Sequence, residues 1–131
     1  MPVILGIGMD LCKIDRIREA IARPRFLERI YTPGEQARIN ACNNESRQGE
    51  IAAGLFACKE AVSKALGTGF SDFGFSCIEV LPDKSGRPVC TLSGKAYEHF
   101  AAMGGKNIFV TITHESGMAA ATAVIEGGDP A

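Results

Sequence analysis

Residues 50–66 read EIAAGLFACKEAVSKAL. Apolar side chains recur along this segment at steps of four, three, four and four, which is the spacing of one face of an α-helix. Gly67 follows, and glycine commonly ends helices. The segment therefore predicts a long amphipathic helix whose apolar stripe faces the core. That stripe consists of Ile51, Leu55, Cys58, Val62 and Leu66.

A strand is expected at residues 3–11, and its two faces differ. Even positions include Gly6, Gly8 and Asp10, whereas every odd position is apolar. We therefore expect the odd face to pack against the core. Its side chains are Val3, Leu5, Ile7, Met9 and Leu11.

The other elements follow from helix and turn signals. Thr32, Pro33 and Glu35 form a capping box with proline at the first helical position, so a short helix should begin there. A helix with Ile14, Ile17 and Ile21 on one stripe should end before Pro24, residues 43–49 should be loop, strands should span 76–81, 88–92, 107–113 and 118–125, and a helix should span 93–103.

This order of elements predicts an α+β fold in which a small antiparallel sheet packs on the long central helix. The 131 residues, 46% of them apolar, suit one domain over residues 1–126 with a flexible tail at 127–131. A formal net charge of −1 argues against a general nucleic-acid binder. No apolar run approaches membrane-spanning length.

Five cysteines are present without any C-x-x-C pair, which is typical of a reducing compartment and not of a zinc or disulfide framework. The apolar start contains Asp10 and lacks a basic leader and a cleavage site, so no signal peptide is expected. We therefore expect a cytoplasmic protein.

Glu60 and Lys64 lie one turn apart on the predicted helix, away from its apolar stripe. One interpretation is a surface ion pair between them. However, Ala53, Phe56 and Ala57 share their face, which suggests that a second surface covers it. Asp10 has two interpretations as well, because an aspartate between a strand and a helix is often a helix cap.

Gly6 and Gly8 leave room beside Asp10 for a ligand or for another backbone. Two carboxylates such as Asp10 and Glu60, without histidine or cysteine at ligand spacing, would suit Mg²⁺. The dinucleotide fingerprint fails because its third glycine is replaced by Leu11.

Two further features suggest binding. His114 ends a predicted strand, where a site residue and a structural histidine are about equally expected. Residues 13–29 contain twice as many basic as acidic side chains, which indicates either a solvated face or a dock for an acidic helical partner.

Two motifs together resemble the signatures of the holo-acyl-carrier-protein synthases, the small trimeric type of the 4′-phosphopantetheinyl transferase superfamily. They are GIGMDL at residues 6–11, followed by Arg16, and FACKEAVSKALGTG at residues 56–69. Shorter matches, GRP at 86–88 and VTITH at 110–114, extend the resemblance over nearly the whole chain.

The resemblance implies an enzyme of fatty acid biosynthesis that moves the 4′-phosphopantetheine group of coenzyme A onto a serine of apo acyl-carrier protein, giving adenosine 3′,5′-bisphosphate. It implies a homotrimer with coenzyme A between protomers, and Mg²⁺ on Asp10 and Glu60. Catalytic roles would fall to Asp10, Glu60, Lys64 and His114, coenzyme A contacts to Arg47, Lys64, Gly67, Thr68, Gly86, Arg87, Pro88 and His114, and carrier contacts to Arg16, Arg23 and Phe26.

Two alternative functions are compatible with the sequence. One is a Mg²⁺-dependent nucleotide or pyrophosphate hydrolase, which would not need the basic segment at residues 13–29. The other is a non-catalytic module that binds carrier proteins, for which Asp10 and Glu60 would be dispensable.

Overall fold

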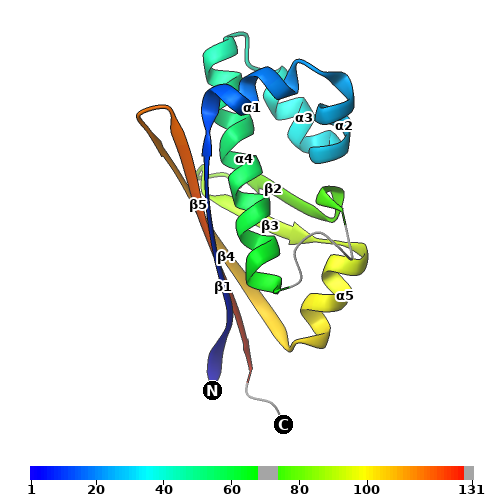
Figure 1. Cartoon of the computed structure of the whole chain (residues 1–131). Helices are drawn as coiled ribbons and strands as arrows, with labels where there is room; N and C mark the ends of the chain where they lie inside the picture. The colour runs from blue at the N-terminus through cyan, green and yellow to red at the C-terminus, as the bar shows by residue number, and fades with distance from the viewer. Residues whose placement is uncertain (68–73, 129–131) are drawn as a thin grey trace.

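The computed structural model of the chain describes residues 1–67 and 74–128. Its centre is helix α4, Glu45–Leu66, which all other layers contact (Figure 1). The Asn44 side chain caps it by accepting a hydrogen bond from the backbone N–H of Arg47 at 3.0 Å. Gly67 ends it with a φ of 86°, a left-handed conformation that suits glycine. The predicted loop at 43–49 is therefore wrong from Glu45 onward, because Asn44 starts the helix a turn early.

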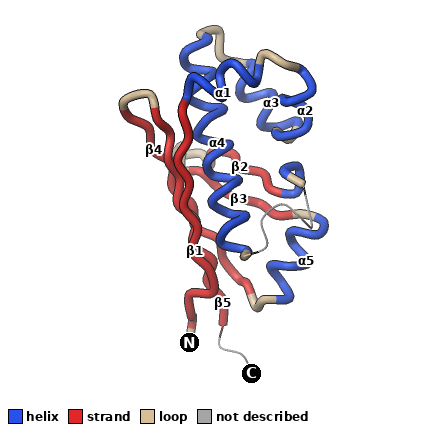
Figure 2. The backbone as a smooth tube through the Cα atoms, viewed as in Figure 1, coloured by secondary structure: helices blue, strands red, loops and turns tan. Residues whose placement is uncertain are grey.

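Two antiparallel sheets pack on α4 (Figures 1 and 2). The larger has the strand order β1-β5-β4, and the smaller is the hairpin of β2 and β3. The strands are β1 Pro2–Lys13, β2 Ile78–Pro82, β3 Pro88–Leu92, β4 Gly105–Glu115 and β5 Met118–Gly128. This arrangement confirms the predicted α+β class with antiparallel strands on a long central helix. The prediction of a flexible tail at 127–131 is wrong for Gly127 and Gly128, because β5 runs through Gly128. Residues 129–131 lie outside the described residues.

The predicted orientation of β1 is wrong over its second half. Gly8 is buried against α4, while Ile7, Met9 and Leu11 are 67%, 64% and 62% exposed. The reason is steric. A Cβ on Gly8 would overlap the carbonyl oxygen of Ala61, so the strand and helix backbones meet directly and only glycine fits between them.

Small helices cover one end of α4 (Figure 1). Pro24 does end the first helix, but it also occupies the first position of a second helix that the sequence reading missed. The capping box of Thr32 and Glu35 is present as predicted. The helices at this end are α1 Ile14–Ile21, α2 Pro24–Ile30 and α3 Pro33–Asn40. Helix α5, Gly94–Ala102, lies near the other end of α4 (Figure 1), and a 3₁₀ turn, η1, spans Phe75–Cys77.

The outer face of the larger sheet points away from α4 and exposes large apolar side chains, with threonines between them. Cross-strand register puts Ile7, Val124 and Phe109 in one row, which continues with rows at Met9 and Leu11. Phe109 is 52% exposed. In the described residues, no helix is long and apolar enough to cross a membrane.

Candidate functional site

Asp10, Glu60 and Lys64 come together where β1 crosses α4. Lys64 Nζ donates hydrogen bonds to Asp10 Oδ1 at 3.1 Å and to the Met9 carbonyl at 3.0 Å. Asp10 is therefore a strand residue that faces the helix, and the interpretation as a helix cap is wrong: Lys13 occupies the N-cap of α1. Lys64 forms an ion pair with Asp10. The interpretation of Lys64 as only the partner of Glu60 in a surface ion pair is therefore incomplete.

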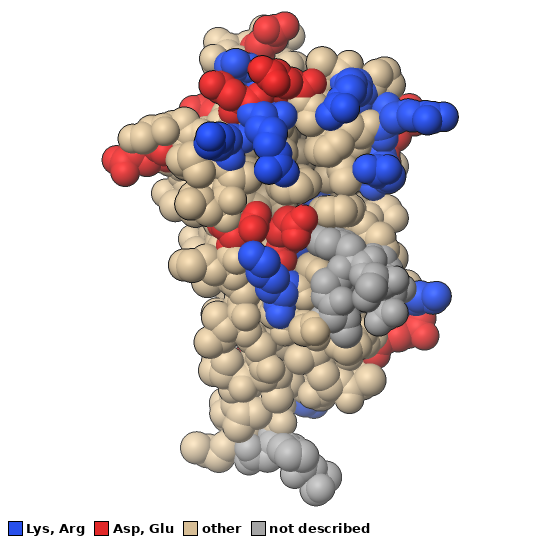
Figure 3. Space-filling view, viewed as in Figure 1, with Lys and Arg blue, Asp and Glu red and all other residues tan. Residues whose placement is uncertain are grey.

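The electrostatics of this cluster favour a cation. Burial raises the pKa of Glu60, the Asp10 carboxylate raises it further, and Lys64 and Arg16 partly offset both effects. The charged form of Glu60, which burial and the Asp10 carboxylate disfavour, would be stabilised by a bound positive ion. Figure 3 shows a compact acidic group halfway along this face, with one basic side chain beside it.

The donor set fits Mg²⁺. Residues 1–67 and 74–128 contain no group of three or more His, Cys, Asp or Glu that could enclose a metal ion. Mg²⁺, however, commonly binds through one or two carboxylates and completes its octahedron with water and substrate phosphates. Asp10 and Glu60 provide that number of carboxylates and leave the other positions open.

The apolar face beside Glu60 is covered by the chain itself. The ring of Phe56 stacks between Phe26 and Phe75, with centroid distances of 6.3 and 5.8 Å. The Arg16 guanidinium lies 6.0 Å from the centre of the Phe56 ring, and that of Arg23 lies 5.9 Å from the Phe26 ring. A copy of the chain is thus not needed to explain this face, and Phe26, a predicted carrier contact, is half-buried.

A second cluster surrounds a cavity of about 170 Å³ between α4, β4 and the β2–β3 turn. Burial lowers the pKa of Arg38, and the neighbouring Arg47 lowers it further. Arg47 also pairs with Glu50 at 3.2 Å, and His114 Nδ1 lies 3.6 Å from the other oxygen of Glu50. The charged form of Arg38, which burial and Arg47 disfavour, would be stabilised by an anion in the cavity.

The turn that borders this cavity is held by Asp83. Its Oδ1 accepts hydrogen bonds from the backbone N–H of Ser85 and Arg87 at 2.8 and 3.0 Å. Gly86, with a φ of 92°, and Pro88 consequently line the cavity. Arg87 does not, because its side chain follows Asp83 outward.

The two clusters lie on different sides of α4. The helix residues that line the cavity lie roughly 80° to 220° around the axis from Glu60, at about 100° per residue. Gly54, which lines the cavity, also lies about 9 Å along the axis from Glu60, at 1.5 Å per residue. A ligand that touched both clusters of one chain would have to wrap around the helix.

A family model described as the 4′-phosphopantetheinyl transferase superfamily matches residues 6–123. The chain belongs to this superfamily. The holo-[acyl-carrier-protein] synthase of Solidesulfovibrio magneticus is 43% identical over 128 residues, covering 95% of this chain and 100% of the relative.

Solved structures of this transferase superfamily agree with the fold. The holo-(acyl-carrier-protein) synthase of Bacillus anthracis, in complex with CoA (3′,5′-ADP), matches with a TM-score of 0.80 and 34% identity, covering 95% of this chain and 98% of that one. The Helicobacter pylori synthase in complex with coenzyme A matches with a TM-score of 0.75 and 34% identity, covering 91% and 98%.

In this member of the transferase superfamily, the first cluster contains the predicted residues Asp10, Glu60 and Lys64. The cavity is lined by the predicted residues Arg47, Gly86, Pro88 and His114. Gly67 lies at the end of α4, and Thr68 lies outside the described residues. Arg38 and Glu50 line the cavity but were missed, because nothing in their spacing distinguishes them from ordinary helix-surface charges. The other histidine, His99, contacts the Leu66 carbonyl through its Nε2 at 2.7 Å.

Proposed function

We propose that this chain is a holo-acyl-carrier-protein synthase, which transfers 4′-phosphopantetheine from coenzyme A to a carrier-protein serine. The observation that carries the proposal is the junction of Asp10, Glu60 and Lys64 in a chain of this superfamily. Relatives named for this activity have been solved with coenzyme A bound.

Asp10 and Glu60 would hold Mg²⁺, whose charge stabilises the negative charge that develops on a pyrophosphate. Lys64 has three N–H donors and uses one on Asp10 and one on the Met9 carbonyl. Within residues 1–67 and 74–128 the third has no acceptor and would be available to a phosphate oxygen of the leaving group. A water molecule ordered by Asp10 or Glu60 would accept the serine proton.

The reaction balances with these groups. The serine oxygen forms a bond to the phosphorus that carries pantetheine, and the pyrophosphate P–O bond breaks. Adenosine 3′,5′-bisphosphate leaves with the electron pair, and the serine proton passes to the base. We assign His114 to nucleotide binding, because in its own chain it faces Glu50 and the cavity.

The cavity of Arg38 and Arg47 would bind phosphate of the nucleotide, with Gly86 and Pro88 against the base or ribose. Arg16 and Arg23 would meet acidic side chains of the carrier, since both guanidinium groups lie over aromatic rings near Glu60. Fatty acid biosynthesis would then be the pathway served. Five free cysteines support a reducing, cytoplasmic location.

Assembly into a trimer would complete the site. The apolar outer face of the sheet, with Ile7 67% exposed, is the kind of surface that identical chains bury. β1 and β4 are the two edges of this sheet, and they carry Asp10 and His114 respectively. A ring of chains joined through these sheets would bring the β1 edge of one beside the β4 edge of the next, uniting the two clusters.

One experiment tests the transfer. Purified protein, Mg²⁺, coenzyme A and apo carrier protein are combined, and the carrier is weighed by mass spectrometry. We expect the mass of one added phosphopantetheine group, and a loss of at least about 100-fold in rate for Glu60→Gln. The control Glu98→Gln, an exposed glutamate on α5, should retain the wild-type rate.

The other outcomes identify other functions. Release of phosphate or nucleotide from coenzyme A with the carrier unchanged would indicate a hydrolase. A carrier that binds but keeps its mass, equally with wild type and Glu60→Gln, would indicate a non-catalytic module. Either result would overturn the proposal.

A further inference from the structure

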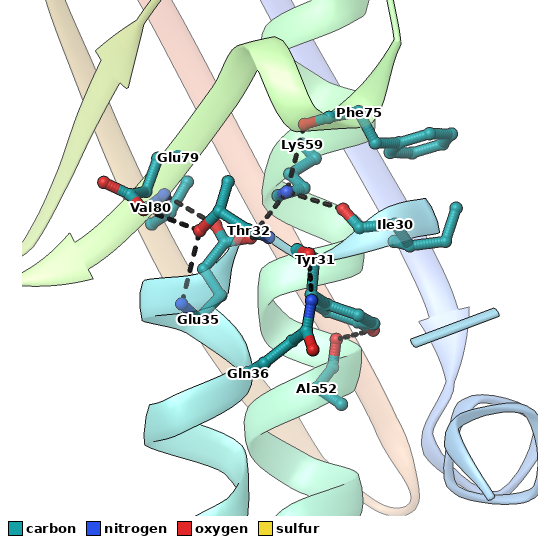
Figure 4. Close-up of polar contacts among 10 residues, drawn as sticks. All are labelled: Ile30, Tyr31, Thr32, Glu35, Gln36, Ala52, Lys59, Phe75, Glu79 and Val80. Carbon is teal, nitrogen blue, oxygen red and sulfur yellow. Dashed lines mark hydrogen bonds and ion pairs between the residues drawn. The ribbon is translucent and has the colours of Figure 1, made fainter. Parts of the chain in front are cut away.

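Lys59, the residue that precedes Glu60 on α4, is fully buried. Lys59 Nζ donates to Glu35 Oε1 at 2.6 Å, to the Ile30 carbonyl at 2.7 Å and to the Phe75 carbonyl at 3.1 Å (Figure 4). All three of its N–H donors are therefore used. None of its acceptors belongs to α4: they come from the end of α2, from α3 and from η1.

The Glu35 carboxylate is also fully buried, and both of its oxygens accept hydrogen bonds. Its Oε1 accepts from the Thr32 backbone N–H at 2.9 Å as well as from Lys59, and its Oε2 accepts from the Val80 N–H at 2.7 Å. Thr32 in turn donates its hydroxyl to Glu79 at 2.6 Å. Figure 4 shows these groups converging from α3, α4 and β2 on one point.

Stability alone does not account for this ion pair. Removing two charges from water costs several kcal/mol, and apolar residues of similar volume often replace a buried pair without loss. Burial accordingly lowers the pKa of Lys59, although Glu35 opposes that effect. What a saturated buried pair provides instead is one defined geometry for the segments it joins.

The geometry that it defines is the rotation of α4 at Glu60. On one side of the helix, Gly8 lets β1 contact the backbone at Ala61. Lys59 lies about 160° around the axis from Ala61, at about 100° per residue, so the ion pair holds the opposite side. Glu60 lies between these two restraints and cannot rotate away from Asp10 without breaking one of them.

We infer that Lys59 and Glu35 are positioning residues that hold Glu60 where it and Asp10 can share a cation. The inference rests on the proposed function of that pair of carboxylates. It also links the helix that carries Arg23 and Phe26 to the reaction site, because the carbonyl of Ile30, at the end of α2, is one of the three acceptors of Lys59.

The test uses the full chain with Lys59→Met and Glu35→Gln combined, so that no unpaired charge stays buried. Mn²⁺ replaces Mg²⁺ as the probe and is titrated by electron paramagnetic resonance in the presence of coenzyme A. We expect Mn²⁺ affinity and kcat to fall by about 10- to 100-fold, as for other groups that orient metal ligands, with KM for coenzyme A nearly unchanged.

A matched control separates positioning from general damage. Val62→Ala removes apolar contacts of a fully buried side chain on the same helix and leaves the ion pair intact. It should lower the thermal midpoint while Mn²⁺ affinity and kcat stay within about twofold of wild type. The single variants should each lose nearly as much as the double, because the two groups act as a unit.

A folded double variant with wild-type Mn²⁺ affinity and kcat would overturn the inference and leave the proposed function intact. Wild-type protein that binds Mn²⁺ but modifies no carrier would remove the proposed function, and the titration would still test the ion pair. Should the double variant fail to fold, Glu35→Gln alone, which keeps an acceptor for Lys59, serves in its place. Unchanged Mn²⁺ affinity in that variant would also contradict the inference.

Discussion

Glu60 is subject to opposing electrostatic effects. Burial and the Asp10 carboxylate disfavour its charged form, whereas Lys64 and Arg16 favour it, and the balance raises the pKa of Glu60. A carboxyl group whose pKa is higher in the folded than in the unfolded protein stabilises the fold at low pH. That contribution is lost as pH rises through the pKa in the folded protein.

Glu60→Gln should therefore raise the thermal midpoint at pH 7 in the absence of metal, by about 1–3 °C for a domain of this size. The difference should shrink as the pH falls toward the ordinary glutamate value of 4.5. Circular dichroism melting curves at several pH values measure it. Glu98→Gln should shift the midpoint by less than about 1 °C at any pH. A lower midpoint for Glu60→Gln at pH 7 would mean that the cationic neighbours dominate.

Asp10, Glu60 and Lys64 could be assigned from the sequence because the motifs at residues 6–11 and 56–69 resemble those of the synthases, whereas their spacing alone left a helix cap and a surface ion pair as alternatives. Sequence patterns could not find the partner of Lys59, since Glu35 was already explained as a helix cap and its second role depends on how α3 packs against α4. The cavity residues Arg38 and Glu50 were missed for a similar reason: a charge that lines a cavity has the same sequence pattern as a charge in water.

Among the elements, the junction of β1 with α4 depends on Gly8, which has no side chain. Gly8→Ala would place a methyl group against the Ala61 carbonyl, so strand and helix would have to separate. We expect a loss of about 3 kcal/mol in the free energy of unfolding, the upper end of the range for overpacking. Urea denaturation measures this loss.

Gly74→Ala is the matched control, because among the described residues its added carbon would have one neighbour within 4 Å, at 4.0 Å, and its φ of −91° suits alanine. It should be neutral or slightly stabilising. Equal stability of Gly8→Ala and wild type would show that the two backbones can move apart freely.

The same junction explains why the orientation of β1 was predicted wrongly. A rule that sends the more apolar face inward assumes that the partner is a layer of side chains. Here the partner is the backbone of an alanine-rich helix, with Ala57 and Ala61 fully buried, so close approach favoured the glycine face. The helix at 50–66 was predicted well because its long periodicity and Gly67 agree, whereas α2 is too short for any periodicity to appear.

At the scale of the whole molecule, the outward face of the larger sheet carries Ile7, Met9 and Leu11, which the sequence predicted for the core. Ile7→Lys should convert a trimer to single chains, measured by light scattering, because the charge would be buried against a neighbouring chain. Transfer activity should fall by at least about tenfold, since the two clusters would no longer meet. Tyr97→Lys, at an exposed apolar position on α5, should change neither property.

A wild-type protein that scatters as one chain and is fully active would contradict a shared site. The sequence could not have identified this face, because the residues that cover it would come from another molecule. Only the register of three strands brings Ile7, Val124 and Phe109 into one row.

The pairing of Pro2 with Gly128 has a practical consequence. Both ends of the described chain lie at the same end of the molecule, far from α1, α2 and α3 (Figure 1). An affinity tag or a fluorescent label attached at either terminus would thus sit remote from the helices proposed to receive the carrier. A carrier domain fused there would instead need a tether long enough to run the length of the strands before its serine could react.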